Sequence, residues 1–478
     1  MPSDRSGSQQ RPRVAVILAA GKGTRMRSSL PKVLHAAAGR PLLQWVIDAA
    51  RAAGCHKILV VVGFGAERVR EEIQGDDLAW VLQAEQRGTG HALAQTEEQI
   101  RELGDSLLLV LSGDVPLVSA ATLEGLAAAA ESGWGSMAVA DLEQPGSLGR
   151  VLAGPDGSLH RIVEAADATP DELAVRLVNA GLYALPAPEV FGYIHRLTTD
   201  NAQGELYLTD AVTGAAAEGK PVRLLTLADP AEAWGVNTRA ELALVHRRLV
   251  DRHLQALMVS GVTVLEPART LIEPGVAVGP DTVIYPDVTL MGRTRIGSGC
   301  TLHQGAWLRD TTVADGATIE PYSVLDGAEV GDGCRVGPFA RLRPASRLLK
   351  GARVGNFVEV KSSLLGEGSK AGHLAYIGDA TIGEGANLGA GVVTCNYDGV
   401  RKHPTEIGRG AFIGSDTMLV APVKVGDGAS TAAGSVVTKN VPEGALAVSR
   451  VRQKNLEGMA GGLRGSRHKG GAKDREET

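Results

Sequence analysis

The second half of the chain repeats with a period of six residues, and this period restricts its fold more than any other feature. From residue 407 onward, every sixth position is aliphatic with one threonine exception: Ile407, Ile413, Leu419, Val425, Thr431 and Val437. A small residue commonly follows the aliphatic one, as in IGEGAN, IGRGAF and VGDGAS. A hexapeptide period is typical of a parallel β-helix, because three short strands form each coil and the small residue permits the corner. The period-two pattern and hairpin turns of a β-sandwich are not found in this half.

The six-residue period is interrupted in two ways. Val313 and Val330 are seventeen residues apart, one fewer than three hexapeptides would give. The segment CNYDGVRKHPTE, residues 395–406, has no hexapeptide pattern. Because a loop that interrupts a solenoid is often functional, we expect this segment to contribute to a site.

The first half has a different organisation, in which short apolar segments alternate with helical ones. VAVILAA, KILVVVGF and SLLLVLSGDVP have the character of buried strands, whereas PLLQWVIDAARAAG and AERVREEIQG have that of helices. This alternation predicts βαβ units, and hence an α/β domain with a Rossmann-like, mostly parallel sheet covered by helices. Ligands of such sheets bind beyond the carboxyl ends of the strands.

These patterns divide the chain into segments of different character. We expect a flexible amino-terminus over 1–12, an α/β domain over 13–237, a linker helix over 238–260, the β-helix over 261–455 and a flexible tail over 456–478. The linker helix is indicated by Leu242, Val245, Leu249 and Leu257, which share roughly one helical face. The alternative is that this segment is one more helix of the α/β domain.

Composition excludes several classes of function. A chain of 478 residues is too long for one ordinary core, and its net charge of −5 favours neither nucleic acid nor an anionic membrane as a partner. The first residues carry no apolar signal segment, so we expect a soluble cytoplasmic protein. The four cysteines, Cys55, Cys300, Cys334 and Cys395, form no CxxC pair and indicate neither a zinc site nor a disulfide framework.

The segment LAAGKGTRM, residues 18–26, follows the first predicted strand and has the composition of a phosphate-binding loop. Gly21 and Gly23 would let backbone N–H groups approach an oxyanion, and Lys22 and Arg25 add positive charge. The spacing fits neither the Walker loop nor the dinucleotide-binding loop. Taken alone, the segment is either a phosphate site or a structural turn.

Two further residues favour the phosphate interpretation. Lys32 lies shortly after the loop, in LPKVL, and Asp114 follows the apolar strand SLLLVL directly. A carboxylate at the carboxyl end of a strand is well placed to hold Mg²⁺ beside phosphates. The alternative for Asp114 is a helix or turn cap.

The β-helix half contains polar stretches that coil packing does not require: RLRPAS, GNFVEVKSS, KAGHLAYIGDA and TCNYDG. Among them, His373 is the candidate general base, because histidine ordinarily titrates near neutral pH. A lone histidine is more often structural or merely exposed, so the residue type does not settle the role.

A family resemblance is carried by motifs in a fixed order. LAAGKGTRM, LPKVL, QAEQRGTGHA, SGDVP, VNAGLY and WGVNTRAEL resemble those of sugar-nucleotide pyrophosphorylases. Together with the hexapeptide half, the chain over residues 13 to 455 resembles the bacterial bifunctional UDP-N-acetylglucosamine pyrophosphorylase/glucosamine-1-phosphate N-acetyltransferases. The resemblance implies a left-handed β-helix, a homotrimer, and a supply of precursor for peptidoglycan and lipopolysaccharide.

For the first half, the resemblance implies uridylyl transfer from UTP to N-acetylglucosamine-1-phosphate with release of pyrophosphate. The implied nucleotide and sugar site comprises Ala19, Ala20, Gly21, Arg25, Lys32, Gln83, Gly88, Thr89, Gly149, Glu164, Asn179 and Asn237. Arg25 and Lys32 would stabilise the phosphates, and Asp114 with Asn237 would hold Mg²⁺. Positioning and charge neutralisation would do most of the catalysis.

For the second half, the resemblance implies acetyl transfer from acetyl-CoA to glucosamine-1-phosphate, with His373 as proton acceptor and no metal. The implied amino-sugar phosphate site comprises Arg343, Lys361, Tyr376 and Asn387. The implied acetyl-CoA site comprises Ala390, Asn396, Tyr397, Ser415, Ala433 and Arg450. The loop pair Asn396 and Tyr397 would also shape the amino-sugar site, and in a trimer Arg450 would serve a neighbouring subunit.

The chain departs from the family pattern at three positions of the first site. Ser112 and Leu148 stand where the family has tyrosine, and Ala180 stands where it has threonine. All three would lie near the sugar or the ribose, so they bear on sugar selectivity more than on the reaction.

Two alternatives to a two-site enzyme follow from the same residues. The first is a pyrophosphorylase whose β-helix serves only for assembly or allostery; His373, Lys361 and Arg343 argue against it, since a passive scaffold has no use for them. The second is a non-catalytic regulatory or assembly subunit, and the joint presence of Lys32, Asp114 and Asn237 argues against that.

Overall fold

The computed structural model describes residues 11–457 and 459, and it contains two compact units. The first unit comprises Met1–Ala256 with Ile272–Gly275, and the second comprises Leu257–Leu271 with Val276–Thr478. The segments predicted to be flexible, 1–12 and 456–478, lie almost entirely outside the described residues.

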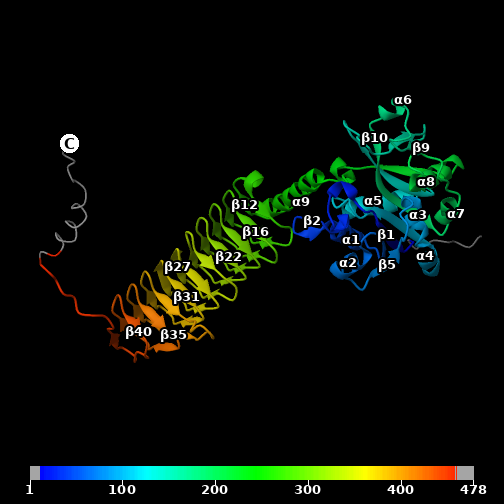
Figure 1. The fold of residues 1–478 in the computed structure, drawn as a ribbon. Coiled ribbons are helices and arrows are strands. Elements are labelled where there is room, and N and C mark those ends of the chain that lie inside the picture. Colours follow the sequence, from blue (N-terminus) through cyan, green and yellow to red (C-terminus); the bar gives the residue numbers. More distant parts are fainter. Residues whose placement is uncertain (1–10, 458, 460–478) are drawn as a thin grey trace, which may run out of the picture. The chain divides into compact units, whose positions relative to one another are not determined.

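The first unit is built on one nine-stranded sheet, whose main path runs β11-β7-β10-β6-β1-β4-β5 (Figure 1). The strands are β1 (Arg13–Ala19), β4 (Lys57–Val62), β5 (Leu78–Leu82), β6 (Ser106–Ser112), β7 (Gly135–Asp141), β8 (Arg150–Ala153), β9 (Leu159–Val163), β10 (Leu177–Ala187) and β11 (Val222–Thr226). β1, β4, β5 and β6 are mutually parallel, and β11 is parallel to β7. β10 is antiparallel to both β6 and β7, so the sheet is mixed around it. The Rossmann-like α/β class predicted from the alternation is confirmed.

Helices cover both faces of this sheet. The helices that precede the β-helix are α1 (Leu42–Ala52), α2 (Ala66–Glu72), α3 (Thr89–Ala94), α4 (Glu97–Leu103), α5 (Ala120–Ala130), α6 (Pro170–Leu173), α7 (Val190–Ile194), α8 (Leu208–Ala217) and α9 (Arg239–Val259). Alternate residues of β1 belong to two buried clusters: Ala15 and Ile17 pack with residues of α1 and α5, and Val14 and Val16 pack with residues of α3, α7 and α8. Burial on both faces of the sheet explains why the sequences of these strands are almost continuously apolar.

Helix α9 begins at a capping box. The Glu241 carboxylate accepts from the backbone N–H of Asn237 at 2.8 Å and of Thr238 at 2.8 Å, and Thr238 Oγ1 accepts from the Glu241 N–H at 3.2 Å. Of the predicted apolar face, Val245, Leu249 and Leu257 are buried and Leu242 is half-buried. As far as Ala256, the helix groups with the first unit.

The second unit is a stack of coils with three parallel sheets along its length (Figure 1). The first sheet contains β12 (Thr263–Val264), β15 (Val283–Ile284), β18 (Thr301–Leu302), β21 (Thr318–Ile319), β24 (Arg335–Val336), β27 (Arg353–Asn356), β30 (Lys370–His373), β33 (Asn387–Leu388), β36 (Phe412–Ile413), β39 (Ser430–Thr431) and β41 (Leu446–Ala447). The second contains β13 (Leu271–Ile272), β16 (Thr289–Met291), β19 (Trp307–Arg309), β22 (Val324–Asp326), β25 (Arg341–Leu342), β28 (Glu359–Lys361), β31 (Tyr376–Gly378), β34 (Val393–Cys395), β37 (Met418–Val420) and β40 (Val436–Val437). The third contains β14 (Ala277–Val278), β17 (Arg295–Ile296), β20 (Thr312–Val313), β23 (Glu329–Val330), β26 (Arg347–Leu348), β29 (Leu364–Leu365), β32 (Ala380–Ile382), β35 (Thr405–Ile407) and β38 (Val423–Val425). This is the predicted left-handed parallel β-helix of hexapeptide repeats.

The exceptions in the hexapeptide pattern have physical explanations. Val313 and Val330 remain register partners on β20 and β23, so the missing residue shortens a corner and leaves the ladder intact. Thr431 is buried like its aliphatic counterparts, and its hydroxyl oxygen accepts from the Gly414 N–H at 3.0 Å and lies 3.0 Å from Thr417 Oγ1. A polar residue is tolerated inside the coil because its hydroxyl is satisfied there.

Candidate functional sites

A hollow of about 250 Å³ lies at the carboxyl ends of β1 and β6, where the α/β pattern places a ligand. Eight of the predicted residues line it: Ala19, Ala20, Gly21, Lys32, Gln83, Gly88, Thr89 and Asp114. Gln86, Ser112 and Glu205 also line it, and the sequence interpretation did not include Gln86 or Glu205.

The glycine-rich loop packs directly on Lys32. Gly23 has a left-handed backbone, with φ of +61°, and a Cβ at this position would lie 2.7 Å from the Lys32 Cβ. A side chain there would displace Lys32, so the glycine is needed for both conformation and close approach. Arg25 is exposed on the short helix that follows, Thr24–Met26, and is not among the lining residues.

Lys32, Asp114 and Asn237 converge although they are far apart in the sequence. The Lys32 ammonium donates to Asn237 Oδ1 at 3.1 Å and is paired with the Asp114 carboxylate, and both partners of the ion pair are largely buried. One carboxylate oxygen and one amide oxygen therefore meet around a single cationic group.

This donor set fits a divalent cation that keeps much of its hydration. Within the described residues, His, Cys, Asp and Glu side chains nowhere gather in threes to form an all-protein metal site. Mg²⁺ is ordinarily held by one or two carboxylates together with water and substrate phosphates. Asp114 and Asn237 supply oxygens of the right kind, and the Lys32 ammonium shows that both can face one positive charge.

Gln83 and Thr89 also line the hollow and are held in place by hydrogen bonds of their own. Gln83 is buried, and its Nε2 donates to the Gly88 carbonyl at 3.2 Å. Thr89 Oγ1 accepts from the Leu208 N–H at 3.0 Å, at the beginning of α8. Gly88 has φ of +108°, and a Cβ there would lie 2.5 Å from the Leu206 carbonyl oxygen.

Gly88→Ala is therefore expected to distort the hollow. The new methyl group would meet a backbone oxygen that has no free rotation, so the wall must shift, and a shift of about 1 Å costs on the order of 100-fold in rate. The measurement is kcat/KM for pyrophosphate release from UTP and N-acetylglucosamine-1-phosphate, the reaction that the family resemblance implies for this half of the chain. Gly104→Ala is the matched control, since Gly104 also has a positive φ but has no atom within 4 Å of its Cβ position. Equal losses in both variants would show that backbone strain, rather than the clash, is responsible.

The residues predicted to bind the sugar, Gly149, Glu164 and Asn179, lie together but are not among the residues that line the hollow. The Asn179 N–H donates to the Gly149 carbonyl at 2.9 Å, and a Cβ at Gly149 would lie 3.3 Å from Glu164 Oε2. Burial raises the pKa of the Glu164 carboxyl, which also accepts from Thr209 Oγ1 at 3.0 Å. Asn179 is held in turn by the Gly181 N–H at 2.9 Å.

The three departures from the family pattern fall in different environments. Ser112 lines the hollow. Ala180 is buried in the core cluster on one face of the sheet, and Leu148 is half-buried against that cluster. Of the three, Ser112 is therefore the one placed to meet a ligand in the hollow.

In the second unit, the same position in four successive coils is occupied by predicted residues: His373, Ala390, Ser415 and Ala433. Asn356 and His373 are register partners on β27 and β30. Continuing the register of β30 to β33, β36 and β39 places Ala390, Ser415 and Ala433 in line with His373. Since neighbouring strands are about 4.8 Å apart, the line from His373 to Ala433 is about 14 Å long. Small residues leave it open to an extended ligand.

Asn356 fixes the tautomer of His373. The imidazole Nδ1 is hydrogen-bonded to Asn356 Oδ1, which can only accept, so Nδ1 carries the proton. Nε2 is then left with a lone pair and can accept a proton from a ligand. The sequence interpretation did not include Asn356, although it lies one coil before His373 at the equivalent position.

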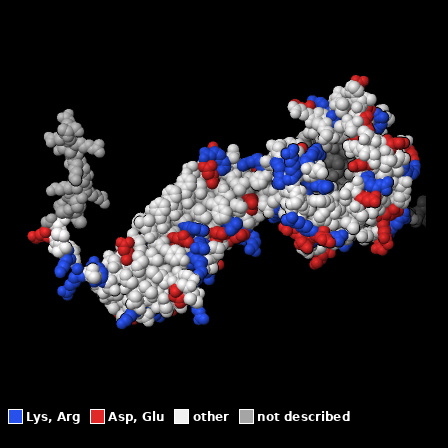
Figure 2. Space-filling view, viewed as in Figure 1, with Lys and Arg blue, Asp and Glu red and all other residues white. Residues whose placement is uncertain are grey.

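Cations gather at one corner of the same coils. Arg343 and Lys361 are neighbours in the register of β25 and β28, and Arg343 donates to Glu359 Oε1 at 3.0 Å. The pKa of Lys361 is lowered, chiefly by the adjacent ammonium of Lys402. Three positive charges this close favour an anionic ligand. Figure 2 shows Lys and Arg side chains gathered, beside Asp and Glu, over the middle coils of the β-helix.

The loop that interrupts the repeat folds against these residues. Asn396 is buried and donates to Asp379 Oδ2 at 2.5 Å, whereas Tyr397 is exposed and donates to the Gly399 carbonyl at 2.6 Å. A Cβ at Gly378 would lie 2.6 Å from the Tyr376 hydroxyl and 2.7 Å from Asn396 Nδ2, so glycine allows the two to meet. The loop also brings Lys402, which the sequence interpretation did not include.

The remaining predicted residues lie at the edges of this site. Asn387 is half-buried on β33, next to Lys370 in the register. Arg450 is exposed and follows β41. The segment before it is tied to the last coil, because the Ser449 N–H donates to Ser435 Oγ at 3.2 Å.

Two family models match the chain. The MobA-like NTP transferase domain matches residues 15–178, and the bacterial transferase hexapeptide, six repeats, matches residues 404–439. None of the helices in the described part of the chain is both long enough and apolar enough to cross a membrane.

Curated relatives match both halves together. The chain is 47% identical over 447 residues to the "Bifunctional protein GlmU" of Pelobacter propionicus, covering 93% of this chain and 97% of the relative. It is 47% identical to the protein of the same name from Syntrophotalea carbinolica, covering 92% and 95%. It is 46% identical to that of Alkalilimnicola ehrlichii, covering 93% and 95%.

Proposed function

Because the chain belongs to the family of bifunctional GlmU proteins, we propose that its two units divide two reactions between them. The protein is a bifunctional enzyme of UDP-N-acetylglucosamine synthesis, with acetyltransferase and uridylyltransferase activities. The second unit acetylates glucosamine-1-phosphate from acetyl-CoA, and the first joins the product to UMP taken from UTP. Two observations support this assignment of one reaction to each unit: the first unit has a hollow at the carboxyl ends of β1 and β6, and the β-helix carries His373 with an available Nε2.

In the first unit, the phosphate oxygen of N-acetylglucosamine-1-phosphate attacks the α-phosphorus of UTP and pyrophosphate leaves. The backbone of Ala19, Ala20 and Gly21 faces the nucleotide, while Gln83, Gly88 and Thr89 form the other wall. Gly149, Glu164 and Asn179 hold the sugar. Lys32 neutralises phosphate charge from within the hollow, and Arg25 approaches from the exposed side of the loop.

Asp114 and Asn237 would hold Mg²⁺, which would supply charge stabilisation for the transferring phosphoryl group. Their own contribution is orientation, because a carboxylate oxygen and an amide oxygen both contact the Lys32 ammonium. Lys32 exchanges its contacts with these two residues for contacts with phosphate when substrate binds.

In the second unit, the amine of glucosamine-1-phosphate attacks the thioester carbonyl of acetyl-CoA. His373 Nε2 takes the amine proton, and CoA leaves as the thiol after the thiolate is protonated. Arg343 and Lys361 bind the sugar phosphate, and Lys402 adds a third cation. Tyr376, Asn387, Asn396 and Tyr397 surround the amino sugar.

The line of small residues beside His373 gives acetyl-CoA its direction. With the thioester at His373, the pantetheine arm runs past Ala390, Ser415 and Ala433. Arg450 closes this end, either of the same site or of a neighbour's site in a homotrimer.

The observation that carries the proposal is the pairing of His373 Nδ1 with Asn356, since it leaves Nε2 as a proton acceptor on a β-helix that also carries a cluster of three cations. The test supplies the purified protein with glucosamine-1-phosphate, acetyl-CoA, UTP and Mg²⁺ and follows CoA thiol and pyrophosphate separately. Release of both products is expected, and pyrophosphate should appear after CoA because uridylyl transfer uses the acetylated sugar phosphate.

A scaffold role for the β-helix gives a different result in the same assay. Pyrophosphate would then form from N-acetylglucosamine-1-phosphate, yet no CoA would be released from glucosamine-1-phosphate. That outcome would leave the first reaction standing and refute the second.

A further inference from the structure

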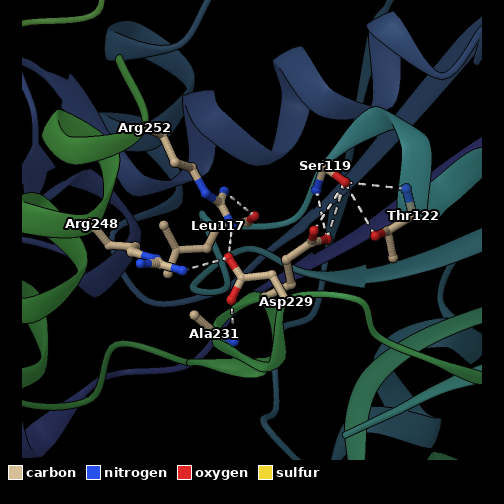
Figure 3. A network of polar contacts seen from close by, with 8 residues as sticks. Leu117, Ser119, Thr122, Asp229, Ala231, Arg248 and Arg252 are labelled. Atoms are coloured by element: carbon tan, nitrogen blue, oxygen red, sulfur yellow. Dashed lines mark hydrogen bonds and ion pairs between the residues drawn. The ribbon is translucent and has the colours of Figure 1, made fainter. Parts of the chain in front are cut away.

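A polar network links helix α9 to the two segments that carry Asp114 and Asn237 (Figure 3). On α9, Arg252 Nη1 donates to the Leu117 carbonyl at 2.6 Å, and its Nη2 donates to Asp229 Oδ2 at 3.0 Å. Leu117 lies three residues after Asp114, in the loop between β6 and α5. One guanidinium therefore joins both segments to the helix.

The two segments are also joined to each other. Ser119, at the other end of the β6–α5 loop, donates through its N–H to the buried carboxylate of Glu232 at 3.0 Å. The Val236 N–H donates to the Asp114 carbonyl at 2.9 Å. Asn237 follows directly, so its amide is placed by the same contacts that place Asp114.

Arg248 provides an internal comparison, because it lies one turn before Arg252 on α9. Arg248 Nη2 donates to Asp229 Oδ2 at 3.1 Å, much as Arg252 does. Only Arg252 is also bonded to the Leu117 carbonyl. Both arginines therefore connect α9 to Asp229, but of the two only Arg252 is hydrogen-bonded to the loop that follows Asp114.

We propose that Arg252 is a positioning residue for uridylyl transfer, which sets the spacing of Asp114 and Asn237 through the Leu117 carbonyl. The inference rests on the proposed function of the first unit. Arg252 does not line the nucleotide hollow, so it acts through the loop. Outer contacts that orient metal ligands typically change affinity or activity by about 10–100-fold when removed.

The test compares Arg252→Ala with Arg248→Ala in the full chain. Arg252→Ala is expected to raise the Mg²⁺ concentration for half-maximal pyrophosphate release by about tenfold and to lower kcat. The KM for UTP is expected to change much less, since Gln83, Gly88 and Thr89, which also line the hollow, are not part of the Arg252 network. Arg248→Ala is expected to resemble the wild type, and acetyl transfer by the second unit reports that both variants are folded.

A binding measurement accompanies the assay. Mn²⁺ is titrated into protein saturated with UDP-N-acetylglucosamine, and free Mn²⁺ is followed by its electron paramagnetic resonance signal. About tenfold weaker binding is expected for Arg252→Ala. Arg252→Lys is expected to fall between Arg252→Ala and the wild type, because one ammonium cannot span both acceptors with the guanidinium's fixed fork.

Two results would overturn the proposal. One is an Arg252→Ala variant that matches Arg248→Ala in both the Mg²⁺ dependence and Mn²⁺ binding. The other is a loss of rate in Arg252→Ala with both metal measurements unchanged. Failure of the proposed function is distinguishable from either, since the wild type would then release no pyrophosphate at all.

Discussion

Asp114→Asn is expected to reduce pyrophosphate release on the order of 100- to 1,000-fold while leaving acetyl transfer at the wild-type rate. The substitution keeps the size and one oxygen of the side chain, so the Lys32 contact can persist as a hydrogen bond. It removes the carboxylate that lies with Asn237 around the Lys32 ammonium, and with it the charge that would hold Mg²⁺. The measurement is the rate of pyrophosphate formation from UTP and N-acetylglucosamine-1-phosphate over a range of Mg²⁺ concentrations.

Asp105→Asn is the matched control for this variant. Asp105 immediately precedes β6, whereas Asp114 follows its carboxyl end, and Asp105 pairs with Arg11 at 3.3 Å on the surface. Exposed pairs of this kind contribute little, so the control should keep both activities. If Asp114→Asn retained the wild-type rate and Mg²⁺ dependence, the placement of the cation at Asp114 and Asn237 would be wrong.

Local sequence rules were sufficient to find the parts of the first site that lie at strand ends. Asp114 was predicted from its place after the apolar β6, and the sheet order puts β6 beside β1 and its glycine-rich loop. Asn237 has no such signal, because it is held by contacts with the Asp114 segment and by the cap of α9. The alternation of strands and helices also could not predict that β10 is antiparallel to its neighbours. A strand buried on both faces has a nearly continuous apolar sequence whether it is parallel or antiparallel.

In the β-helix, the six-residue period predicted the fold, and it also predicts which residues lie beside one another on neighbouring coils. Each coil returns the chain to the same position, so the neighbours of His373 lie about one coil away in the sequence, and Asn356 could have been found by that count. Lys402 could not, because its loop leaves the period and packs back by contacts such as Asn396 with Asp379. The period predicts which residues of the repeats lie at equivalent positions, but it does not predict the conformation of a loop inserted between them.

His373→Ala is expected to lower CoA release from glucosamine-1-phosphate and acetyl-CoA by about 100- to 10,000-fold. A protonated amine is not a nucleophile, and the variant loses the nitrogen whose lone pair the Asn356 contact leaves free. Pyrophosphate release from N-acetylglucosamine-1-phosphate should be unchanged, because the variant alters only the exposed side of one coil.

The control and the pH dependence separate a base from a structural residue. His303→Ala removes a histidine that packs on Tyr285 with ring centroids 4.8 Å apart, in the same β-helix, and should keep acetyl transfer. Residual activity of His373→Ala should rise with pH more steeply than that of the wild type, since hydroxide and free amine replace the missing base. Uniform loss across pH, or equal loss in His303→Ala, would mean that His373 supports the coil and that another group accepts the proton.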